Sequence, residues 1–230
     1  MYTSSIFKRF VIINLKAYSE GMSKNAIKLA RIAKEVANKS GISISLAPQF
    51  TDLALIAKEV DIPLYAQHID PVTLGSHTGY ILAEAVKEAG AIGTLINHSE
   101  RRLPFTSVEA CIRRAKDVGL ISCVCADTPQ VAQRISSYNP DIVAVEPPEL
   151  IGTGIPVSKA KPEVVSNTVK LVREMNTDVT IICGAGITKG EDVSAALALG
   201  TEGVLIASGI VKAKNQYAAL LDIALALKLN

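Results

Sequence analysis

The stretch 141-DIVAVEPPELIGTG-154 decides how the rest of the chain is interpreted. Its apolar run Ile142–Val145 is rich in β-branched residues, which is typical of a buried strand. Glu146 follows this run, and two prolines follow Glu146. Because proline cannot donate to the hydrogen-bond ladder of a sheet, the strand has to end there. The pattern therefore predicts a carboxylate at the tip of a buried strand.

A glycine-rich segment lies a few residues beyond this carboxylate. In Gly152-Thr153-Gly154 the backbone N–H groups are not shielded by large side chains, so they can approach an anion closely. A base at a strand tip beside an anion-binding backbone is what proton abstraction from a small phosphorylated substrate requires.

Outward from this stretch, short apolar runs alternate with helix-like runs along the whole chain. Eight runs are predicted to be strands: Phe10–Leu15, Ile42–Leu46, Leu64–Gln67, Ala91–Ile96, Leu120–Cys125, Ile142–Val145, Val179–Cys183 and Gly203–Ile206. Strict alternation implies a parallel sheet, and eight units imply closure into a ring. No linker or shift in composition divides them. We therefore expect residues 1–230 to form a single (β/α)8 TIM barrel domain of the α/β class.

Glycines and short polar pairs mark the expected ends of several helices. Gly41 and Gly119 are predicted to end the first and fourth helices of the alternation. Two capping boxes are predicted as helix starts, one made by Thr106 with Glu109 and one by Thr188 with Glu191.

Composition narrows the class of protein. Of 230 residues, 49% are apolar and none is tryptophan, so the core must consist mainly of Ile, Val, Leu and Ala. A net charge of +2 gives no reason to expect a nucleic-acid partner. No signal peptide or membrane span is visible, and four cysteines without a CxxC motif are interpreted as free thiols. Cys123 and Cys125 alternate on one face of a strand. These features predict a cytoplasmic protein.

Chemically useful residues fall at the carboxyl ends of several predicted strands, where the active sites of such barrels lie. Each has an ordinary structural role on its own, and their joint placement at one rim is what favours a site. They are Asn14 and Lys16 at the end of the first strand, His98 after the fourth, Glu146 after the sixth, Gly184-Ala185-Gly186 after the seventh and Ala207-Ser208-Gly209 after the eighth.

A metal site is the alternative for the histidines. His68, Asp70, His77 and His98 include ligand types that bind zinc or other transition metals. However, His68-x-Asp70 has no third ligand at a fixed spacing, and His77 lies in a long loop. We therefore predict no metal site.

Four motifs occur in order along nearly the whole chain, and together they are specific. They are Asn14-Leu15-Lys16, Asn97-His98-Ser99-Glu100-Arg101, 145-VEPPELIGTG-154 and Cys183-Gly184-Ala185-Gly186-Ile187. In these motifs the chain resembles the triosephosphate isomerase family, and it is most similar to the short archaeal form of that family.

The resemblance implies cofactor-independent interconversion of dihydroxyacetone phosphate and glyceraldehyde 3-phosphate. It assigns Glu146 as the base, His98 as the electrophile, and Lys16 as a catalytic and substrate-binding cation. The further substrate contacts that it implies are Asn14, Ile151, Gly152, Gly186, Ala207 and Ser208. Glu100 is expected to orient or pair with a neighbouring charge. The segment from Pro147 to Gly154 is expected to close as a lid over the phosphate, because an enediol phosphate exposed to water can eliminate phosphate.

Three positions depart from the pattern of the longer members of the family. Asn97 stands where glycine is usual, Pro148-Glu149 where the lid carries an aromatic residue, and Ala185 where a hydroxyl is usual. The long loop from His68 to Gly79 is expected to dock into a second subunit, as it does in the family. The resemblance thus predicts a homo-oligomer, and the short form predicts a tetramer.

Three other functions stay open at this point. One is another barrel isomerase that acts on phosphorylated sugars, although such enzymes often carry carboxylates where this chain has Asn14 and Lys16. The second is a metal-dependent epimerase or aldolase. The third is a non-catalytic sensor of sugar phosphates, which would bind its ligand without turnover.

Overall fold

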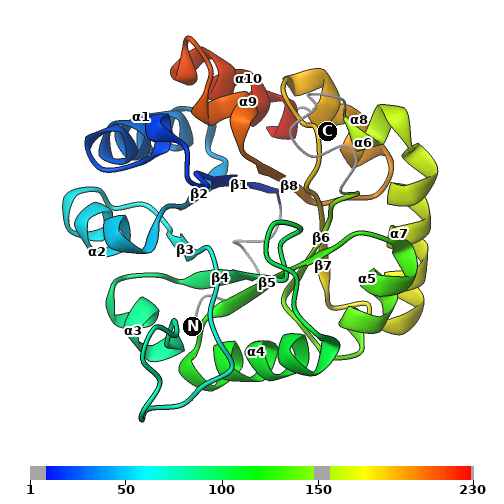
Figure 1. Cartoon of the computed structure of the whole chain (residues 1–230). Coiled ribbons are helices and arrows are strands. Elements are labelled where there is room, and N and C mark those ends of the chain that lie inside the picture. Colours follow the sequence, from blue (N-terminus) through cyan, green and yellow to red (C-terminus); the bar gives the residue numbers. More distant parts are fainter. Residues whose placement is uncertain (1–8, 148–155, 229–230) are drawn as a thin grey trace.

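The computed structural model of the chain describes residues 9–147 and 156–228 (Figure 1). Within these residues, parallel strands form one eight-stranded sheet in the order β2-β1-β8-β7-β6-β5-β4-β3. The strands are β1 Phe10–Asn14, β2 Ser43–Ala47, β3 Tyr65–Ala66, β4 Gly93–Ile96, β5 Ile121–Ala126, β6 Ile142–Val145, β7 Thr180–Cys183 and β8 Gly203–Ile206.

The two ends of this sheet meet and close the ring. An isolated parallel bridge joins Leu46 of β2 to Leu64, the residue before β3. The Leu46 amide also donates to the carbonyl of Pro63 at 3.1 Å. The predicted (β/α)8 barrel is therefore confirmed, with its weakest junction between β2 and the short β3.

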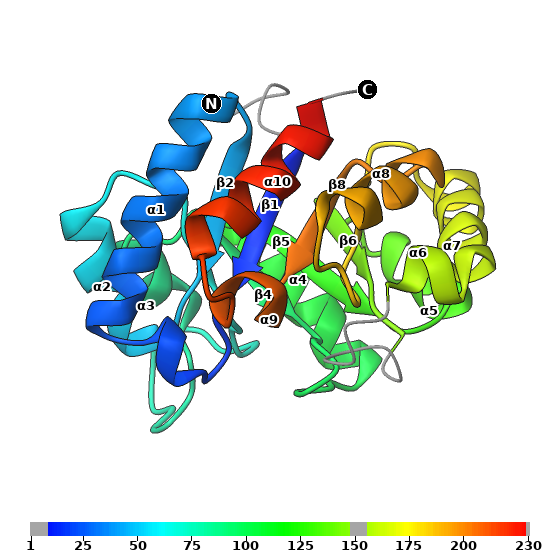
Figure 2. The same cartoon turned by 90° about the horizontal axis from the view of Figure 1, so that it is seen from above.

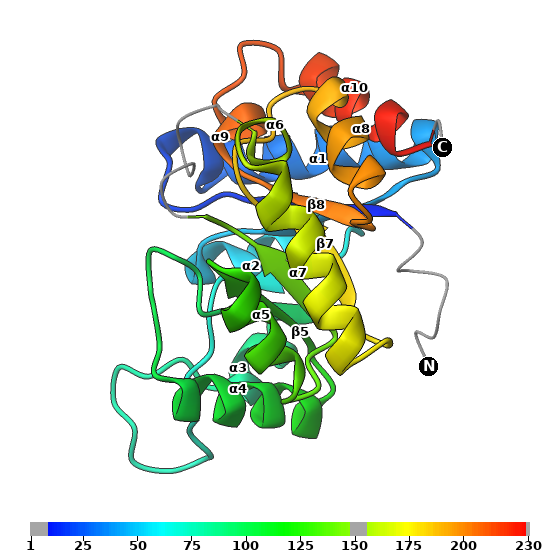
Figure 3. The same cartoon turned by 90° about the vertical axis from the view of Figure 1, so that its right-hand side faces the viewer.

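The helices lie outside the ring of strands, as the views from above and from the side show (Figures 2 and 3). They are α1 Lys24–Ser40, α2 Phe50–Glu59, α3 Ala83–Glu88, α4 Phe105–Val118, α5 Pro129–Ser136, α6 Val157–Ala160, α7 Pro162–Met175, α8 Gly190–Ala198, α9 Ser208–Val211 and α10 Gln216–Lys228, with a 3-10 turn η1 at Ser19–Gly21. In the described part of the chain, no helix combines the length and the hydropathy that a membrane crossing requires.

Alternating side chains build two apolar layers. In β1, Ile12 points into the barrel, whereas Val11 and Ile13 belong to the layer between strands and helices. The inner layer also contains Cys123 and Cys125, so the prediction that these two thiols share one face is confirmed. The four cysteines are free and buried. Burial of these apolar side chains on both faces of the sheet is the main stabilising term of such a barrel.

Helix ends follow the glycine signals but not the predicted capping boxes. Gly41 and Gly119 adopt the left-handed conformation that ends α1 and α4, as predicted. The Thr106 capping box is wrong, because α4 begins after Pro104, whose carbonyl accepts the first helical bonds. The Thr188 box is also wrong. Asp192 caps α8 instead, accepting bonds from the backbone of Thr188 and Lys189 and from the Thr188 hydroxyl.

The parallel arrangement brings the carboxyl ends of the strands to one rim of the barrel. The ends of β1, β4, β6, β7 and β8 place Asn14, His98, Glu146, Gly184 and Ala207 there. Four strands are one or two residues shorter than predicted, namely β1, β3, β4 and β7. These differences do not change which rim carries the polar residues.

The packing around Gly93 generates a test of the inner layer. An added Cβ there would lie 2.4 Å from the Tyr65 ring and 2.8 Å from the carbonyl oxygen of Ile121. We expect Gly93→Ala to lower the free energy of unfolding by about 3 kcal/mol, because neither neighbour can move freely. Gly41→Ala is the matched control. It meets nothing within 4 Å and should cost only about 1 kcal/mol for its left-handed backbone. Urea unfolding measures both, and equal losses would contradict this account of the packing.

Candidate active site

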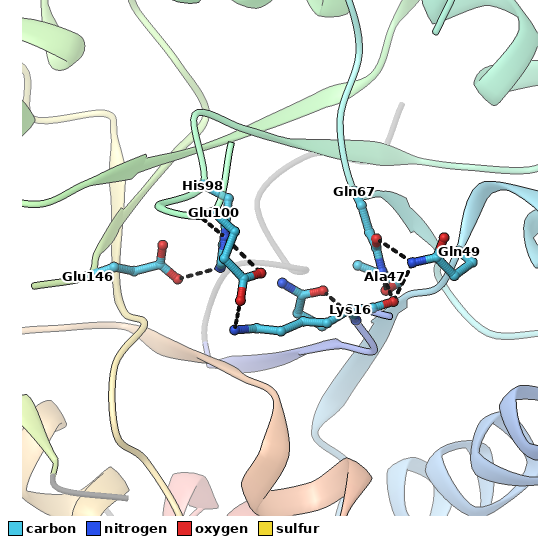
Figure 4. A network of polar contacts seen from close by, with 8 residues as sticks. Lys16, Ala47, Gln49, Gln67, His98, Glu100 and Glu146 are labelled. Atoms are coloured by element: carbon cyan, nitrogen blue, oxygen red, sulfur yellow. Dashed lines mark hydrogen bonds and ion pairs between the residues drawn. The ribbon is translucent and has the colours of Figure 1, made fainter. Parts of the chain in front are cut away.

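One pocket at this rim gathers the polar residues predicted from the sequence. The residues that line it include Asn14, Lys16, His98, Glu146, Gly186, Ala207 and Ser208. Figure 4 shows the side chains of Lys16, His98 and Glu146 approaching one another from three different strand ends. The structure therefore brings together seven of the nine predicted site residues. The other two, Ile151 and Gly152, and the lid segment beyond Pro147, lie outside the described residues.

Glu146 is almost fully buried at the tip of β6, with 2% of its surface exposed. Burial raises the pKa of its carboxyl above the ordinary value, and the His98 imidazole, the Cys125 thiol and the Lys16 ammonium offset only part of that rise. Within residues 9–147 and 156–228, its Oε2 atom has no hydrogen-bond partner. A buried carboxyl oxygen without a partner is free to accept a proton from a substrate carbon.

Gly184 makes room for this carboxylate. An added Cβ at Gly184 would lie 2.5 Å from Glu146 Cγ and 2.8 Å from its Oε1. Any larger residue at the end of β7 would therefore push Glu146 out of its position. The glycine is needed here for space, because its φ angle is not in the left-handed region.

His98 faces Glu146 across the pocket, with 3.6 Å between Nε2 and Oε1. The backbone N–H of Glu100 donates to His98 Nδ1 at 3.2 Å. An Nδ1 atom that accepts a hydrogen bond carries no proton, so this contact assigns the proton of the neutral ring to Nε2. The ring therefore presents a donor to the pocket.

Asn97 shapes the turn that carries His98. Its φ is 61°, a value that glycine adopts easily and that asparagine tolerates better than most residues. Its side chain donates to the Cys125 carbonyl at 3.0 Å and accepts from the Leu103 amide at 2.9 Å. These two side-chain bonds hold the strained backbone of Asn97.

Lys16 also has a left-handed backbone, with φ 49°. Asn14 Oδ1 accepts from the Lys16 amide at 3.0 Å. The Lys16 ammonium lies 2.9 Å from Glu100 Oε1 (Figure 4). The Lys16 side chain is only 9% exposed, whereas that of Glu100 is 57% exposed. An anionic ligand in the pocket would therefore compete with a partly solvated carboxylate for this cation.

Two small-residue turns form the opposite wall of the pocket. Gly186 follows β7 with φ 72°, and Ala207 and Ser208 open the short helix α9 after β8. The first amides of a helix have no carbonyl partner within it, so they are available as hydrogen-bond donors at its start. Gly209 lets the two turns approach, since an added Cβ would lie 2.9 Å from the Ile187 carbonyl.

Some residues of this site were not expected from the sequence. Thr188 lines the pocket although its spacing predicted only a helix cap. Cys125 was interpreted only as a free thiol, but its side chain interacts with Glu146. The alternation that places Cys125 inside the barrel, one strand away from Glu146, is the signal that could have indicated this contact.

The residues considered as metal ligands have other partners. His68 Nε2 lies 3.0 Å from Asp70 Oδ1, and burial lowers the pKa of His68. His77 packs edge-on against Tyr80. Among the described residues, no group of three or more His, Cys, Asp and Glu side chains is arranged to hold a metal ion.

The fold and the site define a class: a (β/α)8-barrel protein with a buried carboxyl, an imidazole and an ammonium group in one pocket at the carboxyl rim. The family model described as triosephosphate isomerase matches residues 9–225. A protein named triosephosphate isomerase from Methanocaldococcus jannaschii is 54% identical over 93% of this chain and 97% of its own length. Another from Archaeoglobus fulgidus is 54% identical over 91% and 94%, and one from Methanosarcina acetivorans is 50% identical over 93% and 96%.

This chain belongs to the triosephosphate isomerase family, as these matches establish. These relatives are archaeal proteins, which agrees with the predicted resemblance to the short archaeal form. The crystal structure of triosephosphate isomerase from Bartonella henselae has the same fold, with a TM-score of 0.75, 20% identity, and coverage of 96% of this chain and 99% of that one.

The buried carboxyl generates a test by pH. Its pKa is raised in the folded state, so the folded protein holds this proton more tightly than the unfolded chain does. As pH rises above 4.5, the ordinary value, the unfolded chain loses its proton first and wild-type stability declines until the raised pKa is passed. Glu146→Gln has no such proton to lose.

We therefore expect Glu146→Gln to be more stable than the wild type at about pH 8 and to lose this advantage below about pH 4.5. Urea unfolding across this range measures the difference. Glu109→Gln, at a half-exposed position on α4, is the control and should leave the pH dependence unchanged. A Glu146→Gln advantage that stays constant with pH would contradict the raised pKa.

Proposed function

We propose that this chain interconverts dihydroxyacetone phosphate and D-glyceraldehyde 3-phosphate through an enediolate, without a cofactor. The observation that supports this best is the convergence of Glu146, His98 and Lys16 on one pocket. The reaction moves a proton between adjacent carbons, so it needs a base, a donor to the carbonyl oxygen and a positive field for the developing negative charge. Family membership supports the same activity.

In this mechanism, Glu146 removes a proton from the carbon beside the carbonyl and becomes a carboxylic acid. The carbonyl oxygen meanwhile gains negative charge and receives a hydrogen bond from His98 Nε2–H, consistent with the tautomer that the Glu100 amide imposes. Glu146 then returns its proton to the neighbouring carbon. A proton also has to pass from the hydroxyl oxygen to the former carbonyl oxygen, and His98 provides it by donating its Nε2 proton to one oxygen and recovering a proton from the other. With both transfers, protons and charges balance.

Burial explains why Glu146 suits this role. A carboxylate with a raised pKa is a stronger base than an exposed one, and the transfer of its charge to a substrate removes the desolvation cost that burial imposes. Lys16 supplies the positive field near the developing enediolate. Asn14 acts on the reaction through the backbone of Lys16, which it bonds.

The phosphate group of the substrate would bind the wall formed by Gly186, Ala207 and Ser208, where the backbone amides at the start of α9 are available as donors. We propose Ile151 and Gly152 as further contacts and the segment Pro147–Gly154 as the lid, on the family resemblance alone. Closing such a lid would exclude water and limit elimination of phosphate from the intermediate.

The proposed activity also suggests a metabolic role and a cellular location. We propose a role in glycolysis and gluconeogenesis, a cytoplasmic location and one domain spanning the whole chain. Four free buried cysteines suit a reducing compartment. Contacts between α1 and α10 bring the first and last helices of the sequence together (Figure 2), which supports one domain.

A coupled assay with glyceraldehyde 3-phosphate tests the reaction. We expect turnover by the wild type that a chelator leaves unchanged, and a fall in kcat of at least about a hundredfold in Glu146→Ala, because removing a general base costs that much. Glu109→Ala, at a half-exposed position far from the pocket, should keep wild-type activity.

The same assay separates the alternatives. Loss of activity with a chelator would indicate a metal-dependent epimerase or aldolase. Binding of the substrate without turnover would indicate a sensor, and turnover of a different sugar phosphate alone would indicate another barrel isomerase. Each of these results would overturn the proposal.

We also propose that the chain assembles into a homo-oligomer, with a tetramer expected from the short form of the family. The loop between β3 and α3 exposes Leu74 and Tyr80, which are 74% and 55% accessible. Asp70 and Ile81 join the two ends of this loop by two hydrogen bonds. The Asp70 amide donates to the Ile81 carbonyl, and the Asp70 carboxylate accepts from the Ile81 amide. A stiff loop with an apolar tip suits insertion into a second copy.

Sedimentation equilibrium tests this assembly. We expect the wild type to sediment as an oligomer and Leu74→Asp to shift it toward smaller species, because a buried charge at the contact is costly. Leu225→Asp, which changes another exposed leucine on α10, is the control. A fully active wild-type monomer would contradict the proposal.

A further inference from the structure

Two glutamine side chains converge on the backbone carbonyl of Lys16 (Figure 4). Gln49 follows β2 and donates from Nε2 to the Lys16 oxygen at 2.5 Å. Gln67 follows β3 and donates from Nε2 to the same oxygen at 3.1 Å. The carbonyl thus accepts one bond for each of its two lone pairs.

The remaining bonds of the two amides leave one consistent orientation. Gln67 Nε2 also donates to the Ala47 carbonyl at 2.9 Å, and Gln67 Oε1 accepts from Gln49 Nε2 at 3.2 Å. Turning either amide over would place its oxygen against the Lys16 carbonyl oxygen, with repulsion in place of a bond. Both side chains are partly buried, so water is a limited substitute for these donors.

The carbonyl that they hold belongs to a strained residue. Lys16 has φ 49°, a region that is strained for a residue with a side chain and persists only where its surroundings enforce it. One residue earlier the chain is still paired with β2, because the Leu15 amide donates to the Ala47 carbonyl at 3.0 Å. It must therefore turn sharply at Lys16, with Asn14 bonding the amide side of this residue.

We infer that Gln49 and Gln67 form an amide clamp that positions Lys16 for catalysis. Asn14 fixes the amide of Lys16, and the clamp fixes its carbonyl. The direction of the Cα–Cβ bond follows from these two restraints, and it sends the ammonium into the pocket, where it lies 2.9 Å from Glu100. The glutamines touch the reaction only through Lys16, so they are positioning residues.

This inference rests on the proposed function, in which the Lys16 ammonium contacts the substrate. An ammonium displaced by about 1 Å loses much of its interaction with a bound anion and with the enediolate. The effect of a broken clamp should therefore appear in KM as well as in kcat. A broken clamp should have this effect only when residue 16 carries an ammonium group.

A double-mutant cycle between Gln49 and Lys16 tests the clamp. In the wild-type background, we expect Gln49→Leu to lower kcat/KM about tenfold, with part of the loss in a raised KM. In a Lys16→Met background, which has no ammonium to position, the same change should alter kcat/KM less than about twofold. Gln49→Glu keeps the shape of the side chain but offers no donor to the carbonyl, and it repeats the test if Gln49→Leu folds poorly.

Asn176→Leu is the matched control. It removes an amide-to-amide bond of 3.0 Å to Asn139 at the opposite end of the barrel, and it should leave kcat/KM unchanged even if stability falls. An equal loss from Gln49→Leu in both backgrounds, or no loss in the wild type, would overturn the clamp. Inactivity of the wild type itself would instead overturn the proposed function, so the two failures are distinguishable.

Discussion

A carboxyl group taken out of water at the end of β6 is the constraint on which the rest of the site depends. Glu146 is nearly inaccessible, and its burial raises its pKa. A charge held in such a place is costly unless the surroundings supply compensation. The imidazole of His98 and the ammonium of Lys16 supply part of it, and Gly184 leaves the space that the side chain occupies. The burial that makes a charged Glu146 costly for the folded protein also makes this carboxylate an effective base.

Two of the four non-glycine residues with positive φ in the described chain belong to the site. They are Lys16, which lines the pocket, and Asn97, which precedes His98. Side-chain amides hold both turns. Asn97 holds its own turn by donating to the Cys125 carbonyl. The turn at Lys16 is held through its backbone by the side chains of Asn14, Gln49 and Gln67. Polar side chains that never meet a substrate thus maintain the geometry of those that do.

The strands and the placement of the site residues could largely be predicted from the sequence, because both depend on the local pattern of apolar residues. The runs Ile142–Val145 and Gly203–Ile206 predicted β6 and β8 to the residue, and parallel alternation then placed Lys16, His98 and Glu146 at one rim. The capping boxes at Thr106 and Thr188 failed because a proline and Asp192 compete for the same helix ends.

The contacts of Gln49, Gln67 and Cys125 were out of reach for another reason. Each depends on which strands become neighbours and on side-chain direction, and spacing along the chain gives neither. The lid beyond Pro147 stays a prediction.

The most direct measurement of the central claim follows the Glu146 carboxyl itself, without substrate. A ¹³C NMR titration of protein labelled at glutamate carboxyls, with the Glu146 signal assigned by its absence in Glu146→Gln, reports the protonation of this one group. The account predicts a signal that remains that of the protonated acid above pH 4.5, the ordinary value. A Glu146 signal that titrates at or below that value would contradict it.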